Sequence, residues 1–452
     1  MTGTMQTNAH PDKGKRPKGG TMSRRKTIIL LSVFALLLAL MLVVAACGDG
    51  DETATTVAPT TATTGEAGGG TTASTAPSGE VKTLKIGAIM GLTGPLSVPS
   101  LAFMRGFEMY VDAVNEQGGV KIGSDTYTLE LIEEDSKGAA EGATTAAQKL
   151  VNQDKVNFVI GAMMEAEIAG IYSVTGPAGV LYIQANSNNP AEPPDVSADK
   201  PLQIRLSVSP DENQALDLDY LLKTYPAVKT IAAAVPDVGS EQSVEMLRAS
   251  AAKRGMEVIH TEIWSWGTTD FIPVYTNIVA SKPDVILGMN SGQAPDQLKA
   301  ARQLGFKGPF ISNCPLGADV FVVQVQDPVM LTDIIVNSPD VTNPSETLEA
   351  LMTRWAAKWP NDPFVSDSFH AYDMPWIVIQ AMQKAGSIDS ATVAATLESM
   401  TNKGDFQTNF GPARMGGMER YGCNRVLFRP YPITRLMNGV AEFVGYLDPV
   451  AE

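Results

Sequence analysis

The sequence is poor in the residues that build metal sites and thiol chemistry. Its 452 residues contain three cysteines, Cys47, Cys314 and Cys423, and three widely separated histidines, and no CxxC pair occurs. A zinc site with the usual ligand spacing is therefore not expected, and we predict no metal and no cofactor. Two alternatives stay open for Cys314 and Cys423, which form either a disulfide or two buried thiols.

Positive charge is also scarce. The chain carries 34 Lys and Arg against 49 Asp and Glu, a formal net charge of −15. Nucleic-acid-binding proteins are normally basic, so we do not expect a nucleic-acid partner. The sequence also lacks a Gly-x-Ser-x-Gly elbow and a metal-binding histidine pair, and nothing marks two carboxylates as a catalytic pair. We therefore predict that the protein is not an enzyme.

The start of the chain carries an export signal. Arg24, Arg25 and Lys26 precede an apolar run over 27–46, whose last residues, Val-Ala-Ala, stand directly before Cys47. A basic segment, an apolar segment and small residues at the cut site predict a signal peptide over 1–46. The cysteine makes the site resemble a bacterial lipobox, which implies a lipid on Cys47 and a membrane anchor. The alternative is a transmembrane anchor, since the run is just long enough to span a bilayer.

Either alternative places the rest of the chain outside the cytoplasm, at the periplasmic or cell-surface face of the membrane. Residues 47–80 are almost entirely Thr, Ala, Gly, Ser and Pro with a few acids. Such a composition cannot bury enough apolar surface to fold, so we predict a flexible tether.

Beyond the tether, short apolar strands alternate with helices. Strands are predicted at 84–90, 127–133, 157–161 and 180–183, with helices between them, and the pattern restarts at 230–235. Strands that alternate with helices of 10–15 residues are typical of βαβ units and parallel sheets. The predicted class is α/β, with two successive doubly wound sheets, and ligands are expected at the carboxyl ends of their strands.

Several segments, in order, resemble the branched-chain amino-acid (Leu/Ile/Val) binding proteins of ABC transporters. They are Lys-Ile-Gly-Ala-Ile-Met-Gly-Leu-Thr-Gly-Pro at 85–95, Arg-Gly-Phe-Glu at 105–108, Val-Asn-Glu-Gln-Gly-Gly-Val at 114–120, Asp135, Phe-Val-Ile-Gly at 158–161, the segment of Arg205, Gly-Thr-Thr-Asp-Phe at 267–271, Pro-Asp-Val-Ile at 283–286, Ala-Tyr-Asp at 371–373 and Tyr-Gly at 421–422. The resemblance covers about 82 to 447.

This resemblance implies a type I periplasmic-binding fold with two Rossmann-like lobes and three crossings between them. Lobe 1 would comprise 82–206 plus 338–422, and lobe 2 would comprise 207–337 plus 423–447. It also implies a monomer that captures a small amino-acid-like, polar or aromatic solute by hinge closure and delivers it to ABC permease subunits. The alternative is a receptor of the same fold that feeds a signalling system.

The resemblance also implies where the ligand lies, and this chain departs from the family there. The serine that holds the ligand carboxylate falls at Glu165 or Ala166, beside Met164. The second carboxylate-binding turn is Asn186-Ser187-Asn188. In lobe 2, an expected aromatic falls at Val238, a tyrosine near Ser291 and an acid near Cys314; Pro99 and Tyr372 complete the predicted ligand-binding set.

Of these residues, Glu165 says most about the chemical class of the ligand. A helix N-terminus favours an anion, but a carboxylate side chain at that position repels a ligand carboxylate. A neutral amide, a polyol-like or aromatic compound, or a cation is therefore expected in preference to a simple zwitterionic amino acid. The alternative is that Glu165 is a first-turn acid that points to water.

Overall fold

The structure is a computed structural model. It describes residues 80–449 apart from 95–96, 186–195, 208–209, 238–239, 266, 290–292, 313–316, 340, 342 and 363. The predicted signal peptide, Cys47 and nearly all of the predicted tether therefore lie outside the described residues. Within the described part of the chain, no helix is long and apolar enough to cross a membrane.

The first run of elements alternates strands and helices as the sequence predicts. It contains β1 (Val81–Met90), α2 (Ser97–Glu116), β2 (Val120–Ile122), β3 (Asp125–Asp135), α3 (Ala140–Lys149) with a π-helical turn (Leu150–Asp154), β4 (Phe158–Gly161), α4 (Glu165–Thr175), β5 (Leu181–Gln184) and β6 (Gln203–Arg205).

The alternation restarts in a second run. Its elements are α5 (Pro210–Thr224), β7 (Thr230–Pro236), α6 (Ser240–Lys253), β8 (Glu257–Trp264), α7 (Ile272–Ala280), β9 (Val285–Gly288), α8 (Ala294–Gln303), β10 (Phe310–Ser312), α9 (Ala318–Val325) and β11 (Ile334–Val336).

A third run completes both sheets. It comprises α10 (Glu346–Lys358), α11 (Asp367–Ala385), α12 (Ser390–Ser399), β12 (Phe406–Thr408), β13 (Gly411–Gly416), α13 (Met418–Tyr421), β14 (Val426–Phe428), β15 (Tyr431–Met437) and β16 (Val440–Leu447).

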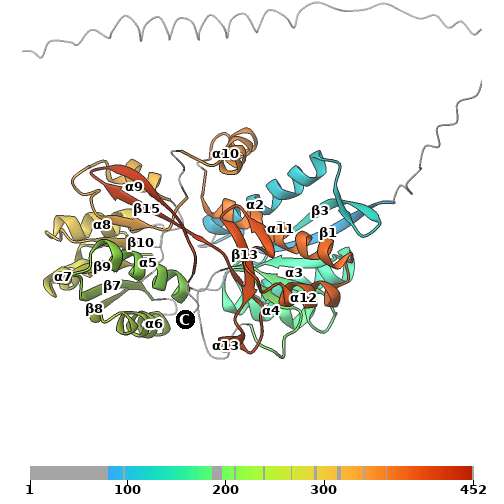
Figure 1. Cartoon of the computed structure of the whole chain (residues 1–452), viewed down its shortest axis with the longest axis horizontal. Helices are drawn as coiled ribbons and strands as arrows, with labels where there is room; N and C mark the ends of the chain where they lie inside the picture. Colours follow the sequence, from blue (N-terminus) through green and yellow to red (C-terminus); the bar gives the residue numbers. More distant parts are fainter. Residues whose placement is uncertain are drawn as a thin grey trace, which may run out of the picture. The chain divides into compact units, whose positions relative to one another are not determined.

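These strands form two sheets, which confirms the predicted α/β class. One sheet has the order β12-β13-β14-β6-β5-β4-β1-β3-β2, and the other has the order β16-β15-β11-β10-β9-β7-β8. We call the first sheet with its helices lobe 1 and the second lobe 2; in Figure 1 each sheet has helices on both faces. The central strands pair in parallel, as in doubly wound folds.

The chain passes between the sheets three times: between β6 and β7, between β11 and β12, and between β14 and β15. One predicted boundary differs. Residues 423–428 were expected in lobe 2, but β14 pairs with β13 and with Arg205 of β6 in lobe 1. Val426 and Phe428 are buried in a small apolar cluster of lobe 1, while Leu427 packs in the main lobe 1 core.

The strands alternate their side chains between two cores. In β1, Ala88 packs with α2 and α11 on one face of the sheet, while Ile89 packs with α3 and α4 on the other. In β7, Ala232 and Ala233 divide in the same way between the two cores of lobe 2. Burial on both faces explains why these strands are almost continuously apolar in sequence.

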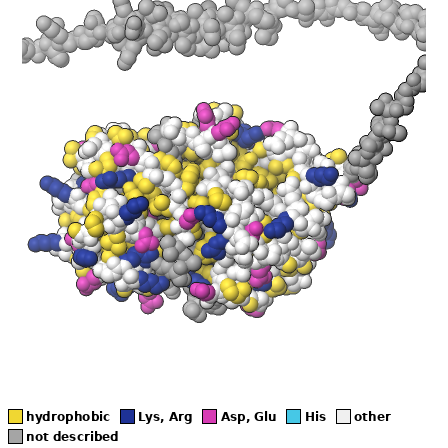
Figure 2. Space-filling model, in the orientation of Figure 1, with side chains coloured by type: hydrophobic (Ala, Val, Ile, Leu, Met, Phe, Trp, Pro, Cys, Tyr) yellow, Lys and Arg dark blue, Asp and Glu magenta, His cyan; other side chains and the backbone are white. Residues whose placement is uncertain are grey.

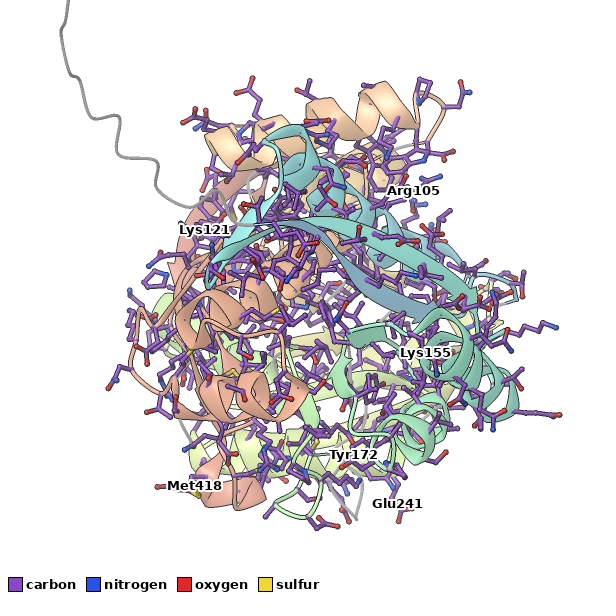
Figure 3. All side chains as sticks on the ribbon, turned by 90° about the vertical axis from the view of Figure 1, so that its right-hand side faces the viewer. Arg105, Lys121, Lys155, Tyr172, Glu241 and Met418 are labelled. Atoms are coloured by element: carbon purple, nitrogen blue, oxygen red, sulfur yellow. The ribbon has the colours of Figure 1, made fainter. Side chains whose placement is uncertain are left out.

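Helix α10, which follows the second crossing, is fixed to α2 by Arg105. The guanidinium carbon lies 4.9 Å from the ring centre of Trp355 and 4.6 Å from that of Trp359. Its Nη2 atom donates to Asp362 at 2.6 Å. Arg105 lies beside α10 in Figure 3. A guanidinium between two indole rings stabilises a contact by cation–π attraction.

Candidate functional site

Each sheet has one topological switch point, which is the position where the order of the strands reverses direction. From β1 the chain moves through α2 to β3 on one side, and β4 then pairs on the other side of β1. Helices α2 and α3 pack on opposite faces as a result. The same reversal occurs around β7, with β8 on one side and β9 on the other. Ligands of open α/β sheets bind outside the carboxyl ends of the strands at such points.

The loop after β4 is held tightly at the lobe 1 switch point. Gly161 has φ of 137°, and a Cβ added there would lie 1.9 Å from the carbonyl oxygen of Ile89. Ala162 has φ of 64°, which is rare for a residue with a side chain, and its N–H donates to the same carbonyl at 2.8 Å. The Ser100 hydroxyl of α2 lies 3.6 Å from the sulfur of Met163. The backbone here is preorganised, which suits a binding wall.

Glu167 fixes the start of α4. Its carboxylate is buried, accepts from the backbone N–H of Met164 at 3.0 Å, and accepts a short hydrogen bond from the Ser136 hydroxyl. The sequence analysis missed this residue. The available signal was a glutamate at the third position of the helix, which commonly turns back to cap the helix start.

Asp135 holds the loop after β1. Its carboxylate accepts from the backbone N–H groups of Leu92, at 2.9 Å, and Lys137, at 2.7 Å, and from the Thr93 hydroxyl at 2.8 Å. Burial opposes the charge, but these hydrogen bonds together hold the pKa of Asp135 below its ordinary value. This position belongs to the sequence segments that resemble the binding-protein family.

Four predicted ligand-binding residues lie around the lobe 1 switch point. Met164 and Glu165 are half-buried and Ala166 is exposed at the start of α4, while Pro99 is half-buried in the first turn of α2. Pro99 precedes Ser100, whose hydroxyl meets Met163. The structure therefore brings residues from α2 and α4 together at this edge of the sheet.

Tyr372 lies elsewhere. It is on α11, and its ring meets Tyr110 of α2 edge to face at 5.2 Å. Tyr110 is ten residues beyond Ser100 on the same helix, which corresponds to about 15 Å along its axis. The structure does not bring Tyr372 together with the start of α4.

The other predicted ligand-binding residues, Asn186, Ser187, Asn188, Val238, Ser291 and Cys314, lie outside the described residues. Cys423 is a free, buried thiol in lobe 1, which agrees with the thiol alternative for that residue.

At the lobe 2 switch point, Asp237 follows β7 and is exposed, and Met289 follows β9. Gln214 of α5 is 2% exposed, and its Nε2 atom lies 3.9 Å from the sulfur of Met289. Its Oε1 atom is buried without a hydrogen-bond partner. A buried carbonyl oxygen without a hydrogen-bond donor is costly to the folded state.

One turn further along α5, a buried acid meets the second crossing. Asp217 accepts from the Asn337 side-chain nitrogen at 2.7 Å. Burial raises the pKa of Asp217 to about 7, although the hydrogen bond from Asn337 acts in the opposite direction. The Asn337 side-chain oxygen is buried without a partner.

A buried cation lies at the end of β6. The Nη2 atom of Arg205 donates to the Tyr421 hydroxyl at 2.9 Å, and its guanidinium carbon lies 5.0 Å from the centre of that ring. Arg205 is thus directed toward α13, and two strand spacings separate β6 from β4. Among the described residues, no three His, Cys, Asp or Glu side chains gather as metal ligands do.

A groove of about 840 Å³ lies between α2 and α10. Its charged lining residues are Asp112, Glu116, Glu346, Glu349, Arg354 and Lys358. Arg354 pairs with Glu116 through two hydrogen bonds, of 2.7 and 2.6 Å. Asp112 and Glu116 are at the carboxyl end of α2, whereas the switch point is at its amino end. Over the face in Figure 2, basic and acidic side chains are interspersed.

Three comparisons relate this chain to known proteins. A Leu/Ile/Val-binding protein homologue of Brucella melitensis is 24% identical over 326 residues, which cover 70% of this chain and 83% of that protein. The branched-chain amino-acid binding protein of Streptococcus pneumoniae, solved with isoleucine, has a TM-score of 0.62 at 20% identity, covering 80% of this chain and 99% of that one. A solute-binding protein of Rhodopseudomonas palustris, solved with benzoate, has a TM-score of 0.63 at 17% identity, covering 82% and 98%.

The structural matches show that the fold is that of type I periplasmic binding proteins. The family model described as "Periplasmic binding protein" matches residues 83–439. The relatives in these comparisons are solute-binding proteins. With more than half of its length matched, and with two switch points on sheets joined by three crossings, the chain belongs to the periplasmic binding protein family.

Proposed function

We propose that this protein is the extracytoplasmic solute-binding component of an ABC importer. It captures a small amino-acid-like, polar or aromatic solute, closes two lobes over it by a hinge motion and delivers it to permease subunits. Family membership and the names of the relatives support this function. A lipid on Cys47 would keep the protein, as a monomer, at the outer face of the cytoplasmic membrane.

The observation that carries the proposal is the topology. Each sheet has its own switch point, and within the described residues the chain passes between the two lobes three times. A few connecting residues can absorb the backbone rotation of a hinge, and a ligand that touches both lobes favours the closed state.

We assign the lobe 1 wall of the site to Pro99, Met164, Glu165 and Ala166. The lobe 2 wall includes Asp237 and Gln214, which the sequence analysis did not select. The predicted residues Asn186, Ser187, Asn188, Val238, Ser291 and Cys314 follow strands of the two sheets and complete the proposed site. For Tyr372 we propose only a contact near the hinge.

Thermal unfolding of the full-length protein in detergent tests solute binding. A ligand that binds only the folded state raises the melting temperature, and the stabilisation grows with the logarithm of the ratio of its free concentration to its Kd. The panel contains branched-chain amino acids, amides, polyamines and aromatic acids. Small-angle scattering with a stabilising compound should show a smaller radius of gyration. A stabilising compound that leaves the radius unchanged would argue against closure.

Glu165→Ser tests the assigned wall, with Glu346→Ser as its control. Both glutamates are in the first turn of a helix, but Glu346 is on α10. We expect Glu165→Ser to change ligand preference and Glu346→Ser to leave it unchanged. Equal affinities in Glu165→Ser and the unmodified protein would place Glu165 outside the site.

Cys47→Ala tests the anchor. The unmodified protein should sediment with membranes and carry lipid at its mature N-terminus, as measured by mass spectrometry, whereas Cys47→Ala should lack the lipid. Cys423→Ala is the control, since Cys423 is buried in lobe 1. A lipid-free Cys47 in the mature protein would exclude the lipoprotein assignment.

A further inference from the structure

We propose that Asp217, Asn337, Ser338 and Thr434 form a hinge anchor in lobe 2, and that the proton on Asp217 holds this anchor together. These residues lie on or next to the three elements at which the chain enters or leaves lobe 2. Loss of the proton separates two of the three crossings, so the motion of the lobes depends on pH. The inference rests on the proposed function, because it concerns the hinge of the same binding site.

The second crossing begins with Asn337 and Ser338, directly after β11. Ser338 is fully buried, and its hydroxyl accepts from the backbone N–H of Ala318 at 3.2 Å and donates to the carbonyl of Pro339 at 2.9 Å. Its own carbonyl accepts from the hydroxyl of Thr434 at 2.8 Å. Thr434 is on β15, the strand that the third crossing enters. The start of the second crossing is therefore fixed to the lobe 2 end of the third.

Asp217 attaches the first crossing to the same place. It is on α5, the helix that follows the first crossing, and it is 1% exposed. Its carboxyl accepts from Nδ2 of Asn337 at 2.7 Å. Among the described residues, Oδ1 of Asn337 is buried and has no hydrogen-bond partner. The amide of Asn337 therefore has a donor that is used and an acceptor that lacks a donor.

A proton on Asp217 supplies that donor. A neutral carboxyl carries one O–H donor and keeps an acceptor oxygen, whereas a carboxylate only accepts. The neutral form can make two hydrogen bonds to the planar amide of Asn337, since its carbonyl oxygen accepts from Nδ2 and its hydroxyl donates to Oδ1. Burial raises the pKa of Asp217 to about 7, so the neutral form is populated at neutral and mildly acidic pH.

The charged side chains on the elements that pack against α5 are engaged elsewhere. On α6, Arg254 pairs with Asp219 at 2.7 Å, and the other charged residues of that helix are exposed. Beside β11 and on β15, Asp333 and Arg435 pair with each other at 2.8 Å. None of these charges contributes to the shifted pKa of Asp217. The proton is therefore not replaced by a neighbouring cation from these elements.

Ionisation of Asp217 removes the hydroxyl donor and leaves the buried Oδ1 of Asn337 without one. The first and second crossings are then less firmly held to each other in lobe 2. Closure over a solute has to order them again, and this ordering lowers the affinity for the solute. We therefore expect lobe closure to be easier at pH 6 than at pH 8.

Hydrogen–deuterium exchange of the full-length protein in detergent tests the anchor without any solute. Mass spectrometry at pH 6 and pH 8 follows the peptides of α5 and of residues 331–339, after correction for the pH dependence of chemical exchange. Their protection should fall by about fivefold between pH 6 and pH 8, which corresponds to the loss of about one hydrogen bond. Peptides of α3, in lobe 1, should keep their protection. Unchanged protection of the anchor peptides would overturn the inference.

Asp217→Asn is the most direct variant. An asparagine side chain carries a donor and an acceptor at every pH, as a neutral carboxyl does, so the anchor should stay protected at pH 8. Asp219→Asn on the same helix is the matched control and should follow the unmodified protein. If protection in Asp217→Asn falls as far as in the unmodified protein, another group causes the pH dependence and the proposal is wrong.

Thr434→Val tests the link to the third crossing. It removes the hydroxyl that donates to Ser338 and keeps the shape of the side chain. We expect the protection of residues 331–339 to be about fivefold lower at both pH values. Equal protection in Thr434→Val and the unmodified protein would exclude Thr434 from the anchor. The proposed function fails separately, only if no compound of the thermal panel stabilises the protein.

Discussion

The Nη2 atom of Arg429 lies 2.6 Å from Nδ1 of His370, which ties the third crossing to α11. Arg429 is buried, and its guanidinium carbon is 3.8 Å from the ring centre of Phe410 and 5.0 Å from that of Tyr431. We expect Arg429→Lys to lower the free energy of unfolding by about 1–3 kcal/mol, because an ammonium cannot stack on both rings and donate in the same plane. Urea unfolding measures this change. Arg248→Lys, on the exposed face of α6, is the control, and equal losses in both variants would contradict the role of Arg429.

His370 gives the protein a response to acid. Burial, with the charge of Arg429 adding to it, lowers the pKa of His370 well below its ordinary value. The folded state excludes a proton that the unfolded state binds below a pH of about 6.5, so this residue makes stability fall as the pH drops through that value. Between pH 7 and pH 5 the free energy of unfolding of the unmodified protein should fall. In His370→Gln we expect this fall to be smaller by about 1–2 kcal/mol. Arg429→Lys retains His370, so its free energy of unfolding should change with pH as in the unmodified protein. If the curve for His370→Gln runs parallel to that of the unmodified protein, the expectation is wrong.

Asp217 acts in the opposite direction. Burial raises its pKa to about 7, so the folded state holds a proton that the unfolded state releases above a pH of about 4. Its contribution to stability is complete at low pH and is lost as the pH rises to about 7. Asp217→Asn should remove this pH dependence of the free energy of unfolding. The unmodified protein should lose up to about 4 kcal/mol between low pH and pH 8, and the variant should not. Urea midpoints between pH 4.5 and pH 8 measure the difference.

The control for Asp217 is Asp219→Asn on the same helix. Asp219 is exposed and pairs with Arg254 at 2.7 Å. We expect this variant to keep the pH dependence of the unmodified protein. If Asp217→Asn keeps it as well, the carboxyl of Asp217 is ionised in the folded state.

Gly106 sets the distance between α2 and α11. A Cβ at this position would lie 2.5 Å from the carbonyl oxygen of Ser368 and 2.6 Å from the Cβ of Ala371. We expect Gly106→Ala to lower the melting temperature, because overpacking of about 1–3 kcal/mol outweighs the helix propensity of alanine. Gly267→Ala, with no atom within 4 Å of the added Cβ, should be neutral. A melting temperature unchanged in both would show that the two helices separate at little cost.

The fold was predictable because its signal is local and repeated. Apolar strands with helices between them, such as β4 and β5 around α4, predict a parallel sheet without any contact information. The boundary at 422 was wrong because β14 spans only Val426–Phe428 and pairs with β6, far away in sequence. A strand of that length carries no periodicity, so nothing in its residues shows which sheet it joins.

The site was predictable only in part. The position of Glu165 was implied by the family resemblance, and the structure places this residue at the start of α4, directly beyond the loop that follows β4. Glu167 is buried by its contact with Ser136, which no sequence spacing reveals. Gln214 reaches the end of β9 from α5, so its importance depends on how α5 packs across the sheet.

The order of the strands constrains how the polypeptide can be made. Strands β12 to β14 complete lobe 1 and β15 and β16 complete lobe 2, and all five come from the last part of the chain. A product that stops after α12 leaves both sheets unfinished, with the edges of β6 and β11 exposed to aggregation. Neither half can be obtained as one uninterrupted fragment, so a polypeptide synthesised from its N-terminus reaches its native strand set only once β15 and β16 have been made.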